Sequence, residues 1–139
     1  MNRDYFISLE KLSNKTQLDL SDVIDQLAFD EQGLIPVITQ DASTKSILMF
    51  AWMNKQALEK TILDRRMTYW SRSRQKLWIK GETSGHTQEL VAMSFDCDGD
   101  AILCLVDQSG AACHTGRPDC FYLQVDLDNK QVLVEGDAA

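Results

Sequence analysis

The sequence predicts an α+β fold, a single domain built mainly from antiparallel β-sheet with about two helices. Short segments rich in β-branched and aromatic residues recur along the chain, separated by turn-forming Asp, Asn and Gly residues. Only two stretches have the apolar spacing of a substantial helix, and the spacing between strands leaves little room for the crossover helices of a parallel sheet. The expected strands are residues 34–39, 46–53, 67–71, 76–80, 87–95, 101–107, 120–127 and 131–135.

Both expected helices begin at a residue that is favourable as an N-cap. The first starts at Ser21 and is expected to stop at Gly33, because glycine readily adopts the backbone conformation that ends a helix. The second follows Asn54 and ends at Arg65 and Arg66, whose positive charges suit a helix C-terminus.

Composition is consistent with one compact domain, in which an N-terminal helical extension (residues 1–32) precedes the main domain (residues 33–139). No run approaches the roughly 20 apolar residues of a membrane span, and we expect a soluble, cytoplasmic protein that binds no membrane. The net charge of -7 argues against binding of duplex nucleic acid. Residues 65–80, however, carry six of the 14 basic residues and no carboxylate, which indicates a local site for a small phosphorylated ligand.

Three aspartates alternate along residues 96–100, directly after an apolar strand. If this segment is extended, Asp96, Asp98 and Asp100 point to one side and Cys97 to the other. Like charges at this spacing repel one another, and a hard cation such as Mg²⁺ or Ca²⁺ would relieve the repulsion. An acidic surface turn is the alternative. A calcium-binding EF-hand is excluded, because alanine stands where its loop requires glycine.

Four cysteines in a reducing cytosol are expected to be metal ligands, catalytic groups or core residues and not disulfides. Cys97, Cys113 and Cys120 could together bind Zn²⁺ and leave a fourth position open for water, as catalytic zinc sites do. Cys104 lies within an uninterrupted apolar run and is expected in the core. The alternatives for the other three are packed, inert thiols or a dyad of Cys113 with His114, which is disfavoured because adjacent residues of an extended chain point apart.

His114 is a candidate for proton transfer. Beside a metal-bound water, a histidine with an ordinary pKa of about 6.5 could pass a proton to a leaving nitrogen. A further metal ligand or a simple hydrogen-bonding residue are the alternatives for this side chain.

The basic stretch contains the candidate phosphate ligands. Arg72 and Arg74 share a face if their segment is extended, and Lys80 follows six residues later. The Gly-Glu-Thr-Ser-Gly turn, which includes Ser84, can present backbone amides to a phosphate. Two nearby tryptophans offer faces on which a base could stack, although a core position is the default for them.

Six stretches of this chain occur in the order and spacing of a known family. They are LIPVITQD, LMFAWMN, YWSRSR, WIKGETSGH, DCDGDAIL and ACHTGRPDCF. From about Leu34 to Tyr122 the chain therefore resembles the phosphoribosyl-AMP cyclohydrolase family. One departure is Ala111, where the family often has proline, and this change affects loop stiffness more than chemistry.

The resemblance implies a hydrolase that acts on N1-(5-phosphoribosyl)-AMP in L-histidine biosynthesis. Zinc-bound hydroxide would attack C6 and open the adenine ring between N1 and C6. The implied ligands are Cys97, Cys113 and Cys120 for Zn²⁺, and Asp96, Asp98 and Asp100 for Mg²⁺. The resemblance also implies an intertwined homodimer, in which the zinc thiolates come from both subunits.

Two other functions share some of these sequence features. A zinc nucleotide deaminase is disfavoured, because its H-x-E and P-C-x-x-C signatures are missing. A structural zinc module that binds RNA or protein would explain the thiols and the basic strand pair. It gives the three alternating aspartates no purpose, and it predicts a zinc site without an open coordination position.

Overall fold

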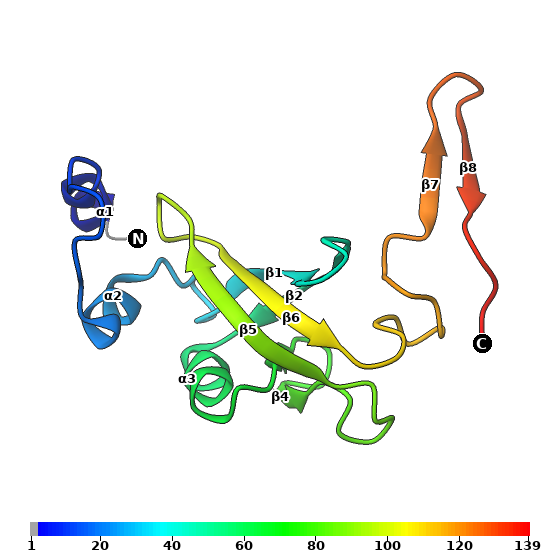
Figure 1. Ribbon diagram of the computed structural model, residues 1–139, viewed down its shortest axis with the longest axis horizontal. Coiled ribbons are helices and arrows are strands. Elements are labelled where there is room, and N and C mark those ends of the chain that lie inside the picture. The colour runs from blue at the N-terminus through cyan, green and yellow to red at the C-terminus, as the bar shows by residue number, and fades with distance from the viewer. Residues whose placement is uncertain (1–2) are drawn as a thin grey trace.

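A four-stranded mixed sheet forms the centre of the protein (Figure 1). The computed structural model describes residues 3–139. The sheet contains β1 (Ile35–Asp41), β2 (Ile47–Met53), β5 (Gln88–Phe95) and β6 (Ile102–Gln108). Their order is β2-β1-β6-β5, with β1 and β6 parallel and the two outer pairings antiparallel.

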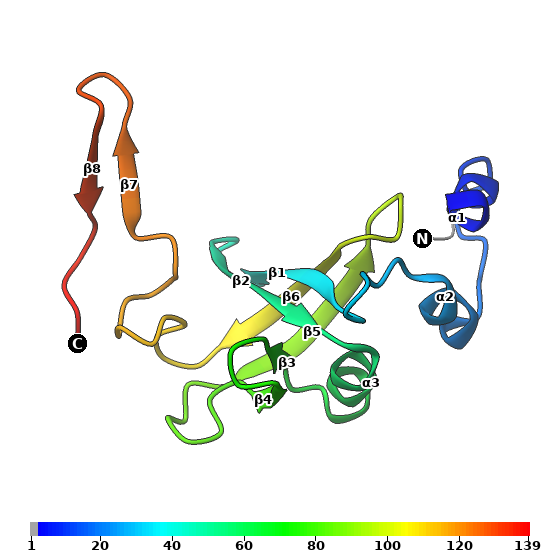
Figure 2. The same cartoon turned by 180° about the vertical axis from the view of Figure 1, so that it is seen from behind.

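The remaining elements lie around this sheet and at its two ends (Figures 1 and 2). Helix α3 and the β3–β4 hairpin lie close beside the sheet, helices α1 and α2 lie at one end, and the β7–β8 hairpin extends away from the other end. These elements are α1 (Arg3–Leu9), α2 (Leu20–Gln26), α3 (Lys55–Asp64), β3 (Thr68–Ser71), β4 (Lys76–Ile79), β7 (Leu123–Asp126) and β8 (Gln131–Val134). Within residues 3–139, no helix has the length and apolar character needed to cross a bilayer.

The predicted α+β class is confirmed, and each expected strand segment contains one strand. The last-but-one strand is shorter than expected, because Cys120 and Phe121 belong to a loop before β7. The parallel neighbours β1 and β6 are separated by residues 42–101, which provide the long connection that parallel pairing needs.

The prediction for the second helix is confirmed and that for the first is corrected. Asn54 caps α3, with its Oδ1 accepting the backbone N–H of Ala57 at 2.8 Å. Helix α2 is capped not by Ser21 but by Asp19, whose Oδ2 accepts the N–H of Asp22 at 3.2 Å. Both sites carry a good capping residue, so local preference alone does not choose between them.

The predicted end of the first helix at Gly33 is also wrong, because α2 ends at Gln26. Gly33 belongs instead to the turn that leads into β1, where its N–H donates to the carbonyl of Asp30 at 2.9 Å. Helix α1 was not expected from the sequence. It has seven residues, and Phe6 is its one buried side chain, so tertiary packing and not intrinsic propensity accounts for it.

The two faces of the central sheet differ in how they are covered. On the inner face, Val37, Ile102 and Cys104 are buried in one cluster with residues of α3 and β3. On the outer face, Ile38 and its cross-strand partner Phe50 remain 37% and 51% exposed. The described part of the chain therefore leaves an apolar outer sheet face open to solvent.

A polar network crosses the buried side of the sheet. The Tyr69 hydroxyl donates to Oε1 of Gln88 at 2.7 Å and lies 2.8 Å from Oγ1 of Thr39. Gln88 in turn donates to Oε1 of Gln108 at 2.8 Å. The hydrogen bonds of the Tyr69 hydroxyl to Thr39 and Gln88 are buried. They hold β3 against β1 and β5, because each of these buried polar groups would otherwise lack a partner.

Replacing Tyr69 with phenylalanine should destabilise the protein, because Gln88 and Thr39 would lose a buried partner. We expect a loss of about 1–3 kcal/mol in the free energy of unfolding, measured by urea titration. Tyr122→Phe is the matched control, since its ring lies beneath the Arg117 guanidinium at 4.1 Å and outside the core network. The control should change stability by less than about 0.5 kcal/mol; equal effects of the two changes would contradict the argument.

The β7–β8 hairpin is apolar but exposed. It lies apart from the main body in both ribbon views (Figures 1 and 2). Leu123, Val125, Val132, Leu133 and Val134 are all between 55% and 64% exposed. Two isolated strands are marginally stable in water, and an exposed apolar pair of this kind is typical of a surface that another chain covers.

Candidate active site

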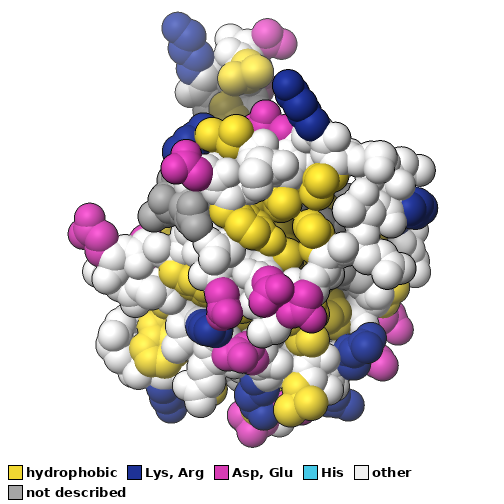
Figure 3. Space-filling model, turned by 90° about the vertical axis from the view of Figure 1, so that its left-hand side faces the viewer, with side chains coloured by type: hydrophobic (Ala, Val, Ile, Leu, Met, Phe, Trp, Pro, Cys, Tyr) yellow, Lys and Arg dark blue, Asp and Glu magenta, His cyan; other side chains and the backbone are white. Residues whose placement is uncertain are grey.

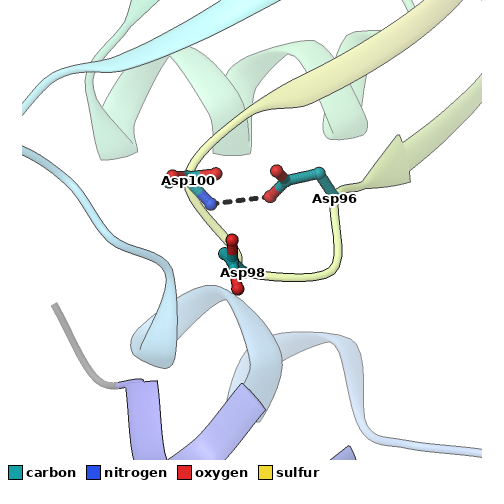
Figure 4. Close-up of side chains that lie close together, drawn as sticks. All are labelled: Asp96, Asp98 and Asp100. Atoms are coloured by element: carbon teal, nitrogen blue, oxygen red, sulfur yellow. Dashed lines mark hydrogen bonds between the residues drawn. The ribbon is translucent and has the colours of Figure 1, made fainter. Parts of the chain in front are cut away.

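Residues 96–100 form a tight turn between β5 and β6, here called the carboxylate turn. Asp96, Asp98 and Asp100 each place a carboxylate oxygen within 4.8 Å of the other two. Figure 4 shows these side chains around the turn, with Asp96 accepting the backbone N–H of Asp100 at 2.8 Å. The sequence suggested an extended conformation for residues 96–100, but the structure has a turn there. The carboxylates converge because the chain turns at Gly99.

The pKa values of Asp96 and Asp100 are shifted in opposite directions. The hydrogen bond to Asp96, burial and the charges of Asp96 and Asp98 raise the pKa of Asp100. Burial opposes the shift at Asp96, but hydrogen bonds from Asp100 and from backbone N–H groups hold its pKa below the usual range. The charges of Asp96 and Asp98 contribute to the shift at Asp100, and a bound cation would relieve that repulsion.

The N-terminal segment packs against the carboxylate turn. The N–H of Ala28 donates to the carbonyl of Gly99 at 2.8 Å, and the ring of Phe6 lies directly against Gly99. Arg3 and Asp98 form an exposed ion pair at 3.8 Å, which contributes little in water. Figure 3, which views this end of the molecule, shows acidic side chains gathered beside an apolar patch.

A methyl group at Gly99 should be costly for two separable reasons. Its φ of +67° is left-handed, and an added Cβ would overlap the ring of Phe6. Gly33→Ala is the matched control, because Gly33 has a φ of +76° and nothing within 4 Å of the added atom. The strain alone should cost about 1–2 kcal/mol at either position.

Gly99→Ala should therefore exceed Gly33→Ala by at least about 1 kcal/mol in denaturant titrations, since overpacking adds to the strain. In a Phe6→Ala background the two alanine substitutions should cost the same. A Gly99→Ala cost that does not depend on Phe6 would show that the ring does not constrain the turn.

The loop after β6, residues 110–120, brings two of the predicted zinc ligands together and is here called the thiol loop. Cys113 is 5% exposed, and its Sγ accepts a hydrogen bond from Oγ1 of Thr115 at 3.1 Å. The thiol of Cys120 lies within hydrogen-bonding reach of Cys113. The Cys120 N–H donates to the carbonyl of Leu48 at 2.8 Å, which ties the end of the loop to β2.

The two neighbouring thiols differ in acidity. Burial raises the pKa of Cys113, but hydrogen bonds from Thr115 and Cys120 and the nearby Lys80 ammonium outweigh it, so the net pKa lies below the ordinary value. Burial of its sulfur and the charge of Cys113 raise the pKa of Cys120 to about 11. Cys113 is therefore the thiol of the pair that ionises first, and a thiolate is the ligand that a soft metal ion prefers.

The other two cysteines lie elsewhere. Cys104 is fully buried on the inner sheet face, where burial raises its thiol pKa to about 12, as expected for a core residue. Cys97 is exposed in the carboxylate turn, at the opposite end of β6 from the thiol loop. Among residues 3–139, the one cluster of three or more metal-ligating side chains is formed by the aspartates, so Cys97 does not meet Cys113 and Cys120 within the chain.

A cavity of about 700 Å³ lies between β4, the turn that follows it and the thiol loop. Residues predicted from the sequence that line it are Arg74, Lys80, Ser84, Cys113 and His114. Lys80 is 8% exposed, and its Nζ donates to the carbonyl of Ala112 at 2.5 Å. Its ammonium thus points into the thiol loop.

Arg72 does not line this cavity. Its guanidinium lies 4.8 Å from the centroid of the Trp52 ring, in an adjoining hollow that also contains Arg74. Trp78 lines the main cavity and is one of the two tryptophans, with Trp70, that the sequence suggested for base stacking. His86 also lines the cavity but was not singled out from the sequence. Both belong to the WIKGETSGH stretch, so the spacing of that stretch was the available signal.

Comparison with known proteins identifies the class of protein that this geometry belongs to. A family model described as phosphoribosyl-AMP cyclohydrolase matches residues 49–122, which run from within β2 to just beyond the thiol loop. The chain is 54% identical over 110 residues to the phosphoribosyl-AMP cyclohydrolase of Roseobacter denitrificans, covering 79% of this chain and 86% of the relative.

Other relatives extend the match. The Hydrogenovibrio crunogenus phosphoribosyl-AMP cyclohydrolase is 50% identical over 128 residues, covering 92% of this chain and 87% of the relative. The enzyme of the same description from Hyphomonas neptunium is 60% identical over 98 residues, covering 70% and 75%. The chain belongs to the phosphoribosyl-AMP cyclohydrolase family and is a hydrolase. This membership favours an enzyme over the interaction module that the thiols alone allowed.

Proposed function

We propose that the chain hydrolyses N1-(5-phosphoribosyl)-AMP and opens its adenine ring between N1 and C6, as a step of L-histidine biosynthesis. The observation that carries this proposal is the cavity in which Cys113 and His114 lie together with basic and hydroxyl side chains of β4 and the following turn. Its volume of about 700 Å³ falls within the range of small-ligand pockets. Family membership supplies the substrate.

We propose Zn²⁺ as the metal of the thiol loop. Two adjacent thiols, one with its pKa held low, fit a soft cation better than Mg²⁺ or Ca²⁺. Bound zinc lowers the pKa of water toward about 7 and so supplies hydroxide for attack at C6. Cysteines that serve as ligands must stay reduced, which is consistent with the cytoplasm as the site of action.

The third thiolate is proposed to come from a second copy of the chain. Cys113 and Cys120 provide two ligands, whereas Cys97 is exposed at the far end of β6. The exposed β7–β8 hairpin and the open outer sheet face offer the apolar surface that a homodimer would bury. In an intertwined dimer with twofold symmetry, each zinc site would combine two thiolates of one subunit with the third thiolate of its partner.

Subunit complementation tests the shared site. Cys97→Ser and Cys113→Ser should each be inactive alone, but a co-expressed heterodimer would contain one site with all three native thiols. Random pairing predicts about a quarter of wild-type activity, because half of the dimers carry one of two sites intact.

In the matched control, a chain with Cys113→Ser is co-expressed with a chain with Cys120→Ser. Both residues belong to the same half-site, so no mixed site would be intact and activity should stay absent. Complementation in the control, or none in the first pair, would contradict ligands shared between subunits.

We propose that the carboxylate turn binds Mg²⁺ through Asp96, Asp98 and Asp100. Their converging carboxylates are hard oxygen ligands. The pKa of Asp100 is raised by its hydrogen bond with Asp96, by burial and then by the charges of Asp96 and Asp98, and a cation would remove this last repulsion. Magnesium usually retains several waters, and it could meet the phosphate or ribose oxygens of the substrate. In a shared site, this turn would approach the partner's thiol loop together with Cys97.

The remaining roles follow from the cavity lining. We assign His114 to protonation of the departing N1, because it is next to a zinc ligand and lines the cavity. Arg72, Arg74 and Ser84 are proposed to bind the two substrate phosphates, since both arginines are exposed beside the cavity. The sequence places Lys80 in the same set, but unlike the two arginines it is buried.

Ring opening followed by ultraviolet absorbance tests the activity directly. With zinc and Mg²⁺ present, the wild-type protein should turn over phosphoribosyl-AMP, and Cys113→Ser should lose at least about a hundredfold in kcat because a zinc ligand is removed. Cys104→Ser is the control for cysteine replacement, as Cys104 is a core residue. No turnover by the wild type, or normal turnover by Cys113→Ser, would refute the proposal.

A further inference from the structure

Lys80 is a buried cation at the edge of the thiol loop. It directly follows β4 and is 8% exposed, while Lys76 at the start of the same strand is exposed. The Lys80 Nζ donates to the carbonyl of Ala112 at 2.5 Å and lies 5.2 Å from the centroid of the Trp78 ring. One side chain therefore ties β4 to the residue that precedes Cys113.

A buried ammonium needs a negative partner, because removing its charge from water is costly. None of the ion pairs formed by residues 3–139 involves Lys80. The groups near it that can become negatively charged are the thiols of Cys120 and Cys113. Burial lowers the pKa of Lys80, and these two thiolates oppose that shift.

The proposed zinc site carries one more negative charge than positive. Three thiolates bring three negative charges to an ion of charge +2, which leaves a net charge of -1 in a partly buried site. A nearby ammonium balances this surplus. Arg72 and Arg74, which are exposed, are better placed to bind phosphate than to serve this purpose.

We propose that Lys80 is a positioning residue of the zinc site, and not a phosphate ligand. Its hydrogen bond to Ala112 fixes the backbone that presents Cys113 to the metal, and its charge offsets the surplus negative charge of the three thiolates. This inference rests on the proposed zinc site and the proposed hydrolysis. Lys80, the lysine of the WIKGETSGH stretch, would then support zinc binding by the cysteines and would not contact the substrate.

Zinc affinity of the dimeric protein, measured by competition with a chromophoric chelator, is the main test. Lys80→Met should bind zinc about tenfold to a hundredfold more weakly, the usual cost of losing a group that supports metal ligands. Lys80→Arg keeps the charge and should recover most of the affinity. Lys76→Met is the matched control on the same strand and should bind zinc as the wild type does.

Two further readouts separate this role from phosphate binding. In Co²⁺-substituted protein, Lys80→Met should alter the thiolate-to-metal absorption, whereas Lys76→Met should not. In zinc-saturated Lys80→Met, the KM for phosphoribosyl-AMP should stay within about threefold of wild type, as expected when no phosphate contact is lost. Unchanged zinc affinity with a raised KM would overturn the inference and restore the phosphate role.

Folding defects are handled by a second variant. Lys80→Gln lacks the charge but retains an N–H donor for the carbonyl of Ala112, and it replaces Lys80→Met if that protein does not fold. Failure of both neutral variants to fold with zinc present would make Lys80 a general core residue and overturn the inference. Wild-type inactivity would count against the proposed function itself, whereas active wild type with unaltered zinc binding in Lys80→Met would count against this inference alone.

Discussion

The length of strand β6 is the constraint on which the rest of the site depends. The carboxylate turn precedes this strand and the thiol loop follows it. A strand of seven residues spans roughly 20 Å, and its pairing with β1 and β5 on both sides restrains it. Two sets of potential ligands are therefore held apart, and no local movement of either loop would bring Cys97 to Cys113.

Twofold symmetry would bring the separated ligands together between two subunits of the proposed dimer. When two copies pair about a twofold axis, the beginning of one β6 strand can approach the end of the other. The surfaces needed for such pairing are already apolar, since the β7–β8 hairpin and the outer sheet face expose leucine, isoleucine, valine and phenylalanine side chains. On this view the exposed apolar surface and the incomplete thiol cluster have one explanation.

Charge is unevenly distributed over the protein. The protein is acidic overall, with three carboxylates concentrated in a single turn. The basic residues of the β3–β4 region divide into the exposed Arg72, Arg74 and Lys76 and the buried Lys80. Exposed guanidinium groups keep their hydration and can exchange it for phosphate, whereas the buried ammonium is committed to the groups packed around it.

Much of the fold and the main chemical groups could be predicted from the sequence. Strand alternation and the Asn54 cap are local signals, and they gave the strand set and helix α3 correctly. Helix α1 and the Asp19 cap depend on packing, which a local pattern does not contain. Ligand chemistry likewise suggested which residue types bind metal. Ligand chemistry could not reveal that Lys80 is buried. Period-two alternation would place Lys80 on the same face as the exposed Lys76. Strand β4 ends at Ile79, however, so the alternation does not extend to Lys80.

The root of the β7–β8 hairpin has a consequence for assembly. The thiol loop is fastened to β2 by the Cys120 N–H, and the hairpin begins three residues later at Leu123. The proposed metal ligand Cys120 and the start of the hairpin thus lie on the same short piece of backbone. A metal that rigidifies Cys120 would also restrict the angles at which the hairpin leaves the body, so in the proposed dimer the order of zinc binding and subunit pairing would affect the assembly pathway.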